Sequence, residues 1–245
     1  MTNGTLTWLG HNAYRIETPG GKTIYIDPWL SSPTCPEGER HPEKADLIAL
    51  THGHFDHVGE TVELYERFGC PVIAAWELRF WLATQGLEVN VGESLNRGGS
   101  TTIDGVTISL TDARHSSSAP DGTALGEACG IVVELEDGVR VYFAGDTCAF
   151  LDMQLIARIH APDLAVLPIG GHVTMGPLEA GIAVELLGVS RVVPTHYGTE
   201  PFLAGTVAEF RQHVPEGVEV IELTPGAWVD LVARTQPLEF PTANT

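Results

Sequence analysis

The stretch Thr51-His52-Gly53-His54-Phe55-Asp56-His57 holds three histidines and one aspartate between positions 52 and 57. It directly follows the apolar run 46–50, which predicts a buried strand, and the sequence from Val58 onward predicts a helix. The histidines therefore lie at the end of a strand, in a loop. Loops of this kind usually present the functional groups of a layered α/β fold.

Metal binding explains this cluster better than a solvated polar loop does, because three imidazoles and a carboxylate are concentrated in one short segment. In an extended loop, residues two apart point the same way, so His52 and His54 can share one ion. Asp56 and His57 fall where the helix begins and point elsewhere, so one loop can serve two neighbouring ions. The cluster contains no cysteine, which argues against a thiolate-rich structural zinc site.

The chain has 245 residues, of which 43% are hydrophobic, and this is enough to build a sizeable core. We find no change of composition that marks a linker, and we expect one domain over residues 1–245. No apolar run approaches the roughly 18 residues that span a membrane, and the N-terminus lacks a basic-then-apolar signal segment. We therefore expect a cytoplasmic protein that does not bind membranes.

The formal net charge is -19. A surface this acidic repels phosphate backbones, so we expect no nucleic-acid partner. A small anionic substrate remains compatible, since a metal pair dominates its own local field. The cysteines are widely spaced, without a Cys-x-x-Cys pair, so we expect free, mostly buried thiols at Cys35, Cys70, Cys129 and Cys148.

Short apolar segments alternate with helical patterns along the chain, which predicts an α/β fold. We expect strands at residues 6–9, 14–17, 23–26, 46–50, 71–75, 87–89, 100–103, 106–110, 129–135, 139–143, 164–170, 191–194, 218–223 and 227–232. We expect helices at residues 60–68, 76–85, 150–159, 178–187 and 203–213. Residues 31–44 predict a surface loop or lid, and the residues after Thr235 predict a loose tail.

Polar candidates recur each time a predicted β segment ends: Asp27, the 52–57 loop, His115, Asp146 and His196. If these residues had a purely structural role, they would not be expected to recur at the ends of strands. Ligands placed at the ends of successive strands of a layered α/β fold do predict it.

The pattern His52-x-His54-x-Asp56-His57, followed by His115, Gly145-Asp146-Thr147 and Thr195-His196-Tyr197, resembles the metallo-β-lactamase superfamily. The resemblance spans residues 5 to about 232. It implies a four-layer αββα sandwich, in which two mixed sheets lie back to back, helices lie outside and metals bind at one edge. It also implies a ligand set, in which His52, His54 and His115 hold the first metal, Asp56, His57 and His196 hold the second, and Asp146 bridges the two.

A narrower resemblance is carried by Leu9-Gly10-His11, Ile26-Asp27-Pro28, His115-Ser116-Ser117-Ser118 and Leu167-Pro168-Ile169-Gly170. These motifs are similar to those of short bacterial and archaeal hydrolases related to L-ascorbate-6-phosphate lactonase. This chain lacks the extra length of the ascorbate lactonases themselves. Members of the group often assemble, so we expect a homo-oligomer.

Two ions about 3.5–4 Å apart can share a water and lower its pKa towards neutrality, which yields a metal-bound hydroxide as nucleophile. Asp56 is the candidate catalytic residue, because it can accept the proton of that water as well as bind metal. We expect a hydrolase that acts on a lactone or other carboxylic ester, with a small phosphodiester or nucleotide as the alternative substrate. Two divalent ions are expected as cofactors, with zinc favoured and manganese, iron, cobalt or nickel also compatible.

Several further residues have two interpretations each. Asp27 either fixes the histidine loop by hydrogen bonds or is a turn residue before Pro28. His11 lines the site or lies on the surface, and His172 contacts substrate or belongs to an exposed loop. Arg114 binds an anionic group or forms a surface ion pair.

The walls of the site and its specificity loops are predicted from position in the sequence. Phe55 and Tyr197 lie beside ligands, so we expect them to wall the site, although packing alone explains them too. We expect specificity to come from loops such as 31–44 and 117–127.

Overall fold

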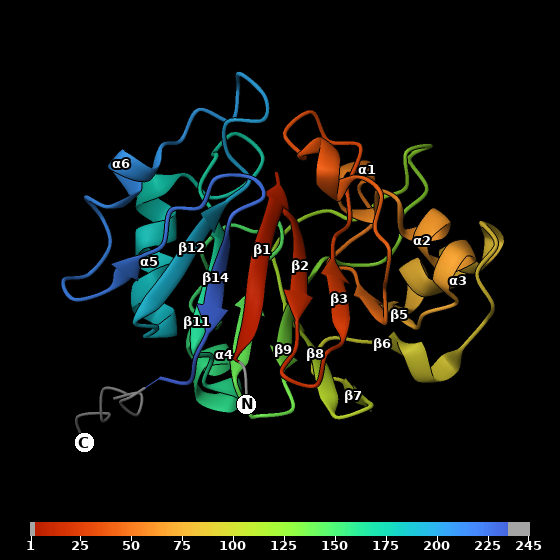
Figure 1. Cartoon of the computed structure of the whole chain (residues 1–245). Coiled ribbons are helices and arrows are strands. Elements are labelled where there is room, and N and C mark those ends of the chain that lie inside the picture. Colours follow the sequence, from red (N-terminus) through yellow and green to blue (C-terminus); the bar gives the residue numbers. More distant parts are fainter. Residues whose placement is uncertain (1–2, 235–245) are drawn as a thin grey trace.

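The computed structural model describes residues 3–234. Within these residues, two seven-stranded sheets pack against each other (Figure 1). The first sheet has the strand order β14 (Trp228–Leu231), β1 (Gly4–Gly10), β2 (Ala13–Glu17), β3 (Thr23–Ile26), β4 (Leu47–Ala49), β5 (Val72–Ala75) and β6 (Ser94–Leu95). The second has the order β13 (Glu219–Val220), β12 (Arg191–Thr195), β11 (Leu164–Pro168), β10 (Arg140–Phe143), β9 (Cys129–Glu134), β8 (Val106–Asp112) and β7 (Ser100–Ile103).

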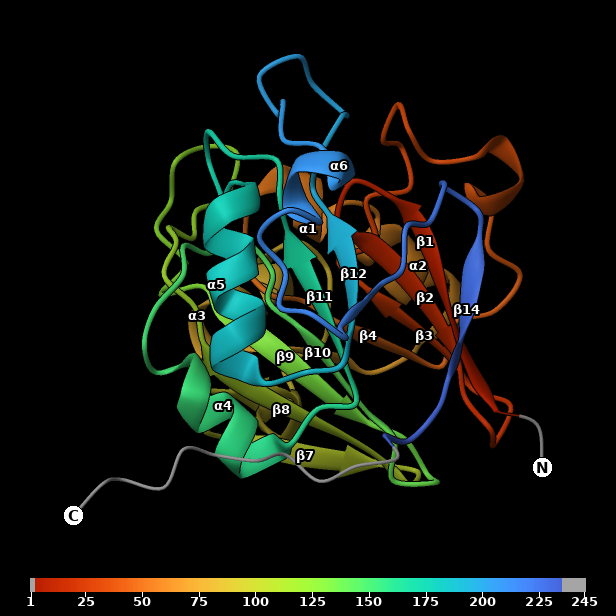
Figure 2. The ribbon, with the colours of Figure 1, turned by 90° about the vertical axis from the view of Figure 1, so that its left-hand side faces the viewer.

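Helices cover the outer face of each sheet (Figures 1 and 2). Helices α2 (Thr61–Phe68) and α3 (Trp76–Thr84) pack on the first sheet. Helices α4 (Met153–His160), α5 (Pro177–Leu187) and α6 (Val207–Phe210) pack on the second. The short helix α1 (Phe55–Val58) lies at one edge, and two 3-10 turns lie at Glu37–Glu39 and Val91–Glu93. The expected α/β class and four-layer αββα sandwich are confirmed.

The central strands are apolar on both faces, because each sheet packs against the other sheet on one face and against helices on the opposite face. In β1, Leu6 and Trp8 point into the core between the sheets, while Leu9 points to the helices α2 and α3. All three side chains are buried. Burial of a large apolar side chain contributes about 1.5–3 kcal/mol, so the buried side chains on both faces of these strands contribute strongly to the stability of the fold.

Three element predictions near the ends of helices were wrong. Residues 87–89 form no strand, because Leu87 instead closes the end of α3 by donating its backbone N–H to the carbonyl of Leu82. The helix expected at 203–213 is reduced to α6, which starts only after the cap residue Thr206. Helix α4 likewise begins at Met153 rather than at position 150.

The two closing strands also differ from expectation. Residues 218–223 contribute only β13, in the second sheet, whereas β14 pairs with β1 in the first sheet. The turn 224–226 therefore crosses between the sheets instead of closing a hairpin. The tail expected after Thr235 lies outside the described residues.

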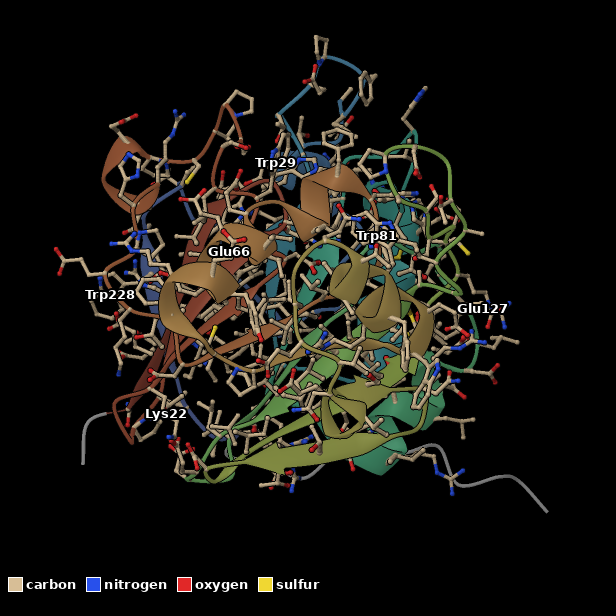
Figure 3. The ribbon with its side chains drawn as sticks, turned by 90° about the vertical axis from the view of Figure 1, so that its right-hand side faces the viewer. Lys22, Trp29, Glu66, Trp81, Glu127 and Trp228 are labelled. Atoms are coloured by element: carbon tan, nitrogen blue, oxygen red, sulfur yellow. The ribbon has the colours of Figure 1, made fainter. Side chains whose placement is uncertain are left out.

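Six strands that precede candidate site residues run in one direction within their sheets. Strands β1, β3 and β4 are mutually parallel in the first sheet, and β8, β10 and β12 are mutually parallel in the second. Their carboxyl ends meet at one edge of the sandwich, which Figure 3 marks by Trp29, with Lys22 at the far end.

None of the helices in residues 3–234 is long and apolar enough to cross a bilayer.

Candidate metal centre

Three site residues directly follow a strand, and each of them has a positive φ. These are His11 (49°), Asp27 (47°) and His196 (53°), which follow β1, β3 and β12. Such a backbone conformation costs a non-glycine residue of the order of 1–3 kcal/mol and persists where the surroundings impose it. The sharp turn lets each side chain leave its strand and enter the site at the sheet edge.

A first cluster of potential ligand atoms comprises His52, His54, His115 and Asp146. One atom from each lies within 4.8 Å of the others. Nε2 of His52 and Nδ1 of His54 are 2.9 Å apart, and Nε2 of His115 is 3.5 Å from Oδ2 of Asp146. The alternation of the loop places His52 and His54 together, as the sequence predicts.

A second cluster comprises His11, Asp56, His57 and His196, again within 4.8 Å. Oδ2 of Asp56 is 3.8 Å from Nε2 of both His57 and His196. Asp56 and His57 are presented by the first turn of α1, which begins at Phe55. His196 arrives from β12, in the other sheet, so the cluster is completed only where the two sheets meet.

Asp146 faces both clusters. Its Oδ1 lies 3.3 Å from Nε2 of His57 and 3.3 Å from Nε2 of His196, while Oδ2 lies 4.0 Å from Nε2 of His52. Two ligands that bind one ion at about 2.0–2.1 Å with tetrahedral angles are about 3.3 Å apart. Oδ1 of Asp146 has this spacing to two histidines of the second cluster, and Oδ2 faces the first cluster at somewhat longer distances.

Three buried atoms test whether the site fits metal ions. Nε2 of His57, Nε2 of His196 and Oδ1 of Asp146 are buried and make no hydrogen bond, although Oδ1 lies 3.3 Å from each of the two nitrogens. Buried polar atoms without partners are rare, because each costs desolvation energy. A divalent cation between them satisfies all three atoms. The residues present fit two metal ions.

The electrostatics of Asp146 agree with a cation site. Burial raises the pKa of its carboxyl, but the neighbouring His196 and His57 outweigh burial and hold the pKa well below its usual range. Burial lowers the pKa of His196, but Asp146 raises it to about 9. Asp146 thus lies where positive charge is strongly favoured, as a bridging ligand requires.

Asp27 contacts the histidine loop through both of its oxygens. Oδ1 accepts from the backbone N–H of Thr51 at 2.8 Å, and Oδ2 accepts from Oγ1 of Thr51 at 2.6 Å and from Nδ1 of His57 at 2.7 Å. Because Nδ1 of His57 donates to Asp27, Nε2 is left with its lone pair directed at the clusters. These contacts match the interpretation of Asp27 as a support for the histidine loop.

His11 is buried and joins the second cluster. Its Nε2 donates to Oδ2 of Asp56 at 2.9 Å, and its Nδ1 lies 3.0 Å from Oγ1 of Thr199. Burial lowers the pKa of His11 to about 4, although the hydrogen bond to Asp56 opposes that shift. Neutral His11 therefore donates a hydrogen bond to Asp56 and accepts one from the Thr199 hydroxyl. The sequence alone did not decide whether His11 lines the site or lies on the surface.

A cavity of about 400 Å³ opens over the clusters. Besides ligand residues and His11, its lining comprises Trp29, Phe55, Ser116, Val173, Glu200, Phe202 and Leu203. Phe55 therefore walls the site, as expected. The segment 199–203 was missed, because its only signal is that it follows the last ligand.

Several other predicted site residues do not line this cavity. Tyr197 instead stacks on Trp8, with ring centroids 5.5 Å apart. His172 is exposed and contacts the ring of Phe202. Arg114 lies over the Phe150 ring and 3.5 Å from Asp152, so it forms a surface ion pair.

The two loops expected to set specificity lie beside other surfaces. Loop 31–44 packs along the first sheet, where Glu39 pairs with Arg15. Loop 117–127 packs its Leu125 side chain against Gly53, beneath the histidine loop. Neither loop contributes to the lining of the cavity, and their role in specificity stays a prediction.

Comparisons with known proteins agree with the geometry. The fold and the paired clusters define a metalloprotein class with a double His/Asp centre at the edge of an αββα sandwich. The sequence profile of the β-lactamase superfamily domain matches residues 22–197. The chain belongs to the metallo-β-lactamase superfamily and, within it, to the UPF0173 metal-dependent hydrolases.

Individual relatives cover nearly the whole chain. A UPF0173 metal-dependent hydrolase of Rubrobacter xylanophilus is 45% identical over 235 residues, covering 92% of this chain and 96% of that protein. One of Koribacter versatilis is 41% identical over 225 residues, covering 90% and 95%. Among solved structures, Igni18, a metallo hydrolase from the archaeon Ignicoccus hospitalis, has a TM-score of 0.84 at 35% identity, covering 95% of this chain and 100% of that one.

Proposed function

We propose that the protein hydrolyses a carboxylic ester, with lactones as the favoured class, and that it uses two divalent metal ions. The observation that carries this proposal is Asp146, whose two oxygens face two His/Asp clusters at the base of one cavity. Zinc is the favoured metal, since imidazole and carboxylate ligands suit it, although the same ligands accept manganese, iron, cobalt and nickel.

When bound, the ions lower the pKa of a water and polarise the carbonyl oxygen of the substrate. The ligands proposed for them are His52, His54, His115, Asp56, His57, His196 and Asp146. Asp56 is also the proposed general base, because it is only partly buried and lines the cavity. His11 donates to Oδ2 of Asp56 and holds that oxygen in place, which leaves Oδ1 to take the proton of the attacking water. Attack of the water oxygen forms a new bond to the carbonyl carbon, collapse of the resulting tetrahedral adduct breaks the acyl C–O bond, and the leaving alkoxide takes the proton that Asp56 accepted.

A phosphodiester is the weaker candidate. Phosphate-binding sites usually carry arginine or lysine, and neither residue is among the described residues that line the cavity. The formal charge of -19 opposes a polyanionic substrate further.

A hydrolysis panel on metal-loaded protein tests the proposal. It compares γ-lactones, aryl esters and an aryl phosphodiester, with Asp146→Asn as the inactive control. We expect lactone or ester turnover that exceeds the control by at least about a hundredfold. A preference for the phosphodiester, or equal rates in the Asp146→Asn variant, would contradict the proposal.

A further inference from the structure

The mouth of the cavity is apolar and exposed. Phe55, Phe202 and Val173 line it and retain 61%, 51% and 45% of their surface in solvent. They come from three separate segments, namely α1, the loop before α6 and the loop before α5. Large apolar side chains that gather around one opening mark a surface which a ligand covers.

Trp29 links this apolar rim to the metal centre. Its ring meets Phe55 edge to face at a centroid distance of 5.6 Å, and it meets His11 in the same way at 5.0 Å. His11 in turn donates to Asp56 in the second cluster. An apolar group held on Phe55 and Trp29 is therefore adjacent to the second cluster, where the scissile bond has to lie.

The loop that carries Phe202 is fixed in place. Gly198 donates its backbone N–H to the carbonyl of Leu203, and Leu203 donates to the carbonyl of Glu200. Thr199 is tied to His11 at 3.0 Å. Phe202 thus belongs to a closed turn attached to the centre, and the rim is preformed for a ligand.

Glu200 places a negative charge at the mouth of the cavity. Glu200 lines the cavity and is exposed, and within residues 3–234 it has no lysine, arginine or histidine within 4.0 Å. An unpaired carboxylate at the entrance repels a carboxylate or phosphate on an incoming molecule.

We infer that the substrate carries an uncharged apolar group, an alkyl chain or aromatic ring, beside its ester, and that Phe55, Trp29, Val173 and Phe202 hold this group while Glu200 excludes anions. This inference rests on the proposed ester hydrolysis and adds the part of the substrate that the rim selects. It narrows the substrate class from esters in general to neutral, apolar lactones or esters.

Binding of molecules that cannot be hydrolysed tests the inference apart from catalysis. Three cyclopentanones serve as lactone analogues: one with a hexyl chain, one with a carboxylate-terminated chain of the same length and one with a methyl group. Their affinities for the metal-loaded protein are measured by calorimetry. We expect the hexyl compound to bind about tenfold or more tighter than either of the others.

Three rim variants and one control define the result. Phe202→Ala lowers the affinity for the hexyl compound about tenfold, whereas Leu151→Ala, an exposed apolar residue outside the cavity, leaves it unchanged. Glu200→Gln raises the affinity for the carboxylate compound about threefold, and Glu200→Lys raises it further. Equal or tighter binding of the carboxylate compound to the wild type, or no binding of any of the three, overturns the inference.

Hydrolysis of the three matching lactones, measured separately, tests the proposed function. If none is turned over while the hexyl analogue still binds as described, the proposed function fails and the rim assignment stands. If all three lactones are hydrolysed at similar kcat/KM, the proposed function stands and the rim assignment fails.

Discussion

Nδ1 of His57 donates to Oδ2 of Asp27 at 2.7 Å, and both side chains are fully buried. Oδ2 of Asp27 also accepts the Thr51 hydroxyl, so one carboxylate sets the ring of a proposed ligand and the start of the histidine loop together. Its removal leaves a buried imidazole without orientation and a buried N–H without an acceptor.

The first prediction concerns this carboxylate. Asp27→Ala should lower metal affinity about 10–100-fold, as loss of a partner that orients a ligand commonly does. The measurement is calorimetric titration with zinc, accompanied by metal analysis of the purified protein. Asp46→Ala is the matched control, because Asp46 also accepts a backbone N–H, from Thr23 at 2.7 Å, but lies outside both clusters. Equal metal affinity in both variants would show that Asp27 is only a turn residue.

The second prediction concerns metal removal. A ligand present at about 100 times its Kd stabilises the native state by about 2.7 kcal/mol, which for a chain of this size corresponds to roughly 5–10 °C in Tm. We expect a chelator to lower Tm by that amount and added zinc to restore it. Asp146→Asn should respond much less, since its side chain can no longer serve two cations. A Tm that is unaffected by the chelator would count against a high-affinity site.

The third prediction separates two roles of His11, which lies among the second cluster but donates to Asp56. His11→Asn tolerates the positive φ but cannot reach Asp56. If His11 positions Asp56, kcat should fall about 10–100-fold while KM and metal content stay constant. His41→Asn, at an exposed histidine elsewhere, is the control. Loss of one metal equivalent in His11→Asn would make His11 a ligand instead.

The fourth prediction concerns the residue before Asp146. Gly145 has a φ of +60°, and a Cβ there would meet Cβ of Thr51 at 2.7 Å. Gly145→Ala should therefore destabilise the protein by about 2–4 kcal/mol, from backbone strain and overpacking together. Gly138→Ala isolates the strain, because Gly138 has a φ of +86° with no atom within 4 Å of the added Cβ, and it should cost only about 1–2 kcal/mol. Urea unfolding measures both, and equal losses would refute the steric part of this argument.

The fifth prediction concerns the thiols. Burial raises the pKa of Cys35 and Cys70 to about 11 and that of Cys129 to about 12, so at about pH 8 these groups remain neutral and unreactive. Cys148 is exposed. A disulfide reagent should modify one thiol quickly in the native protein and three more only after unfolding. Cys148→Ser should remove the fast phase, and two fast thiols in the wild type would contradict the assigned burial.

Much of the centre could be predicted because its signals are local or periodic. The spacing of His52, His54, Asp56 and His57 depends only on strand alternation and the start of a helix. The recurrence of polar residues after successive strands follows from parallel strands ending at one edge. These two regularities, together with the resemblance, predicted both the four-layer fold and all the residues that the two clusters contain except His11, which was left open.

The cavity walls could not be predicted in the same way, because backbone contacts between distant segments place them. A Cβ on Gly170 would meet the carbonyl oxygen of His196 at 2.1 Å, and one on Gly205 would meet that of Ile169 at 1.8 Å. These close approaches fix the loop 198–205 against the ends of β11 and β12. The spacing of Leu203, Val207 and Phe210 favours a longer helix, but Leu203 is drawn into the cavity wall instead.

The division of each cluster between the two sheets has a consequence for assembly of the chain. His52 and His57 come from the first sheet, whereas Asp146 and His196 come from the second sheet and lie far away along the chain, with His196 more than half the chain from either histidine. An ion held by both sets links segments that are far apart along the chain, so the sheets cannot separate without loss of ligands from that ion. Neither half of the chain holds a complete set of ligands, so capture of metal reports that the two sheets have docked.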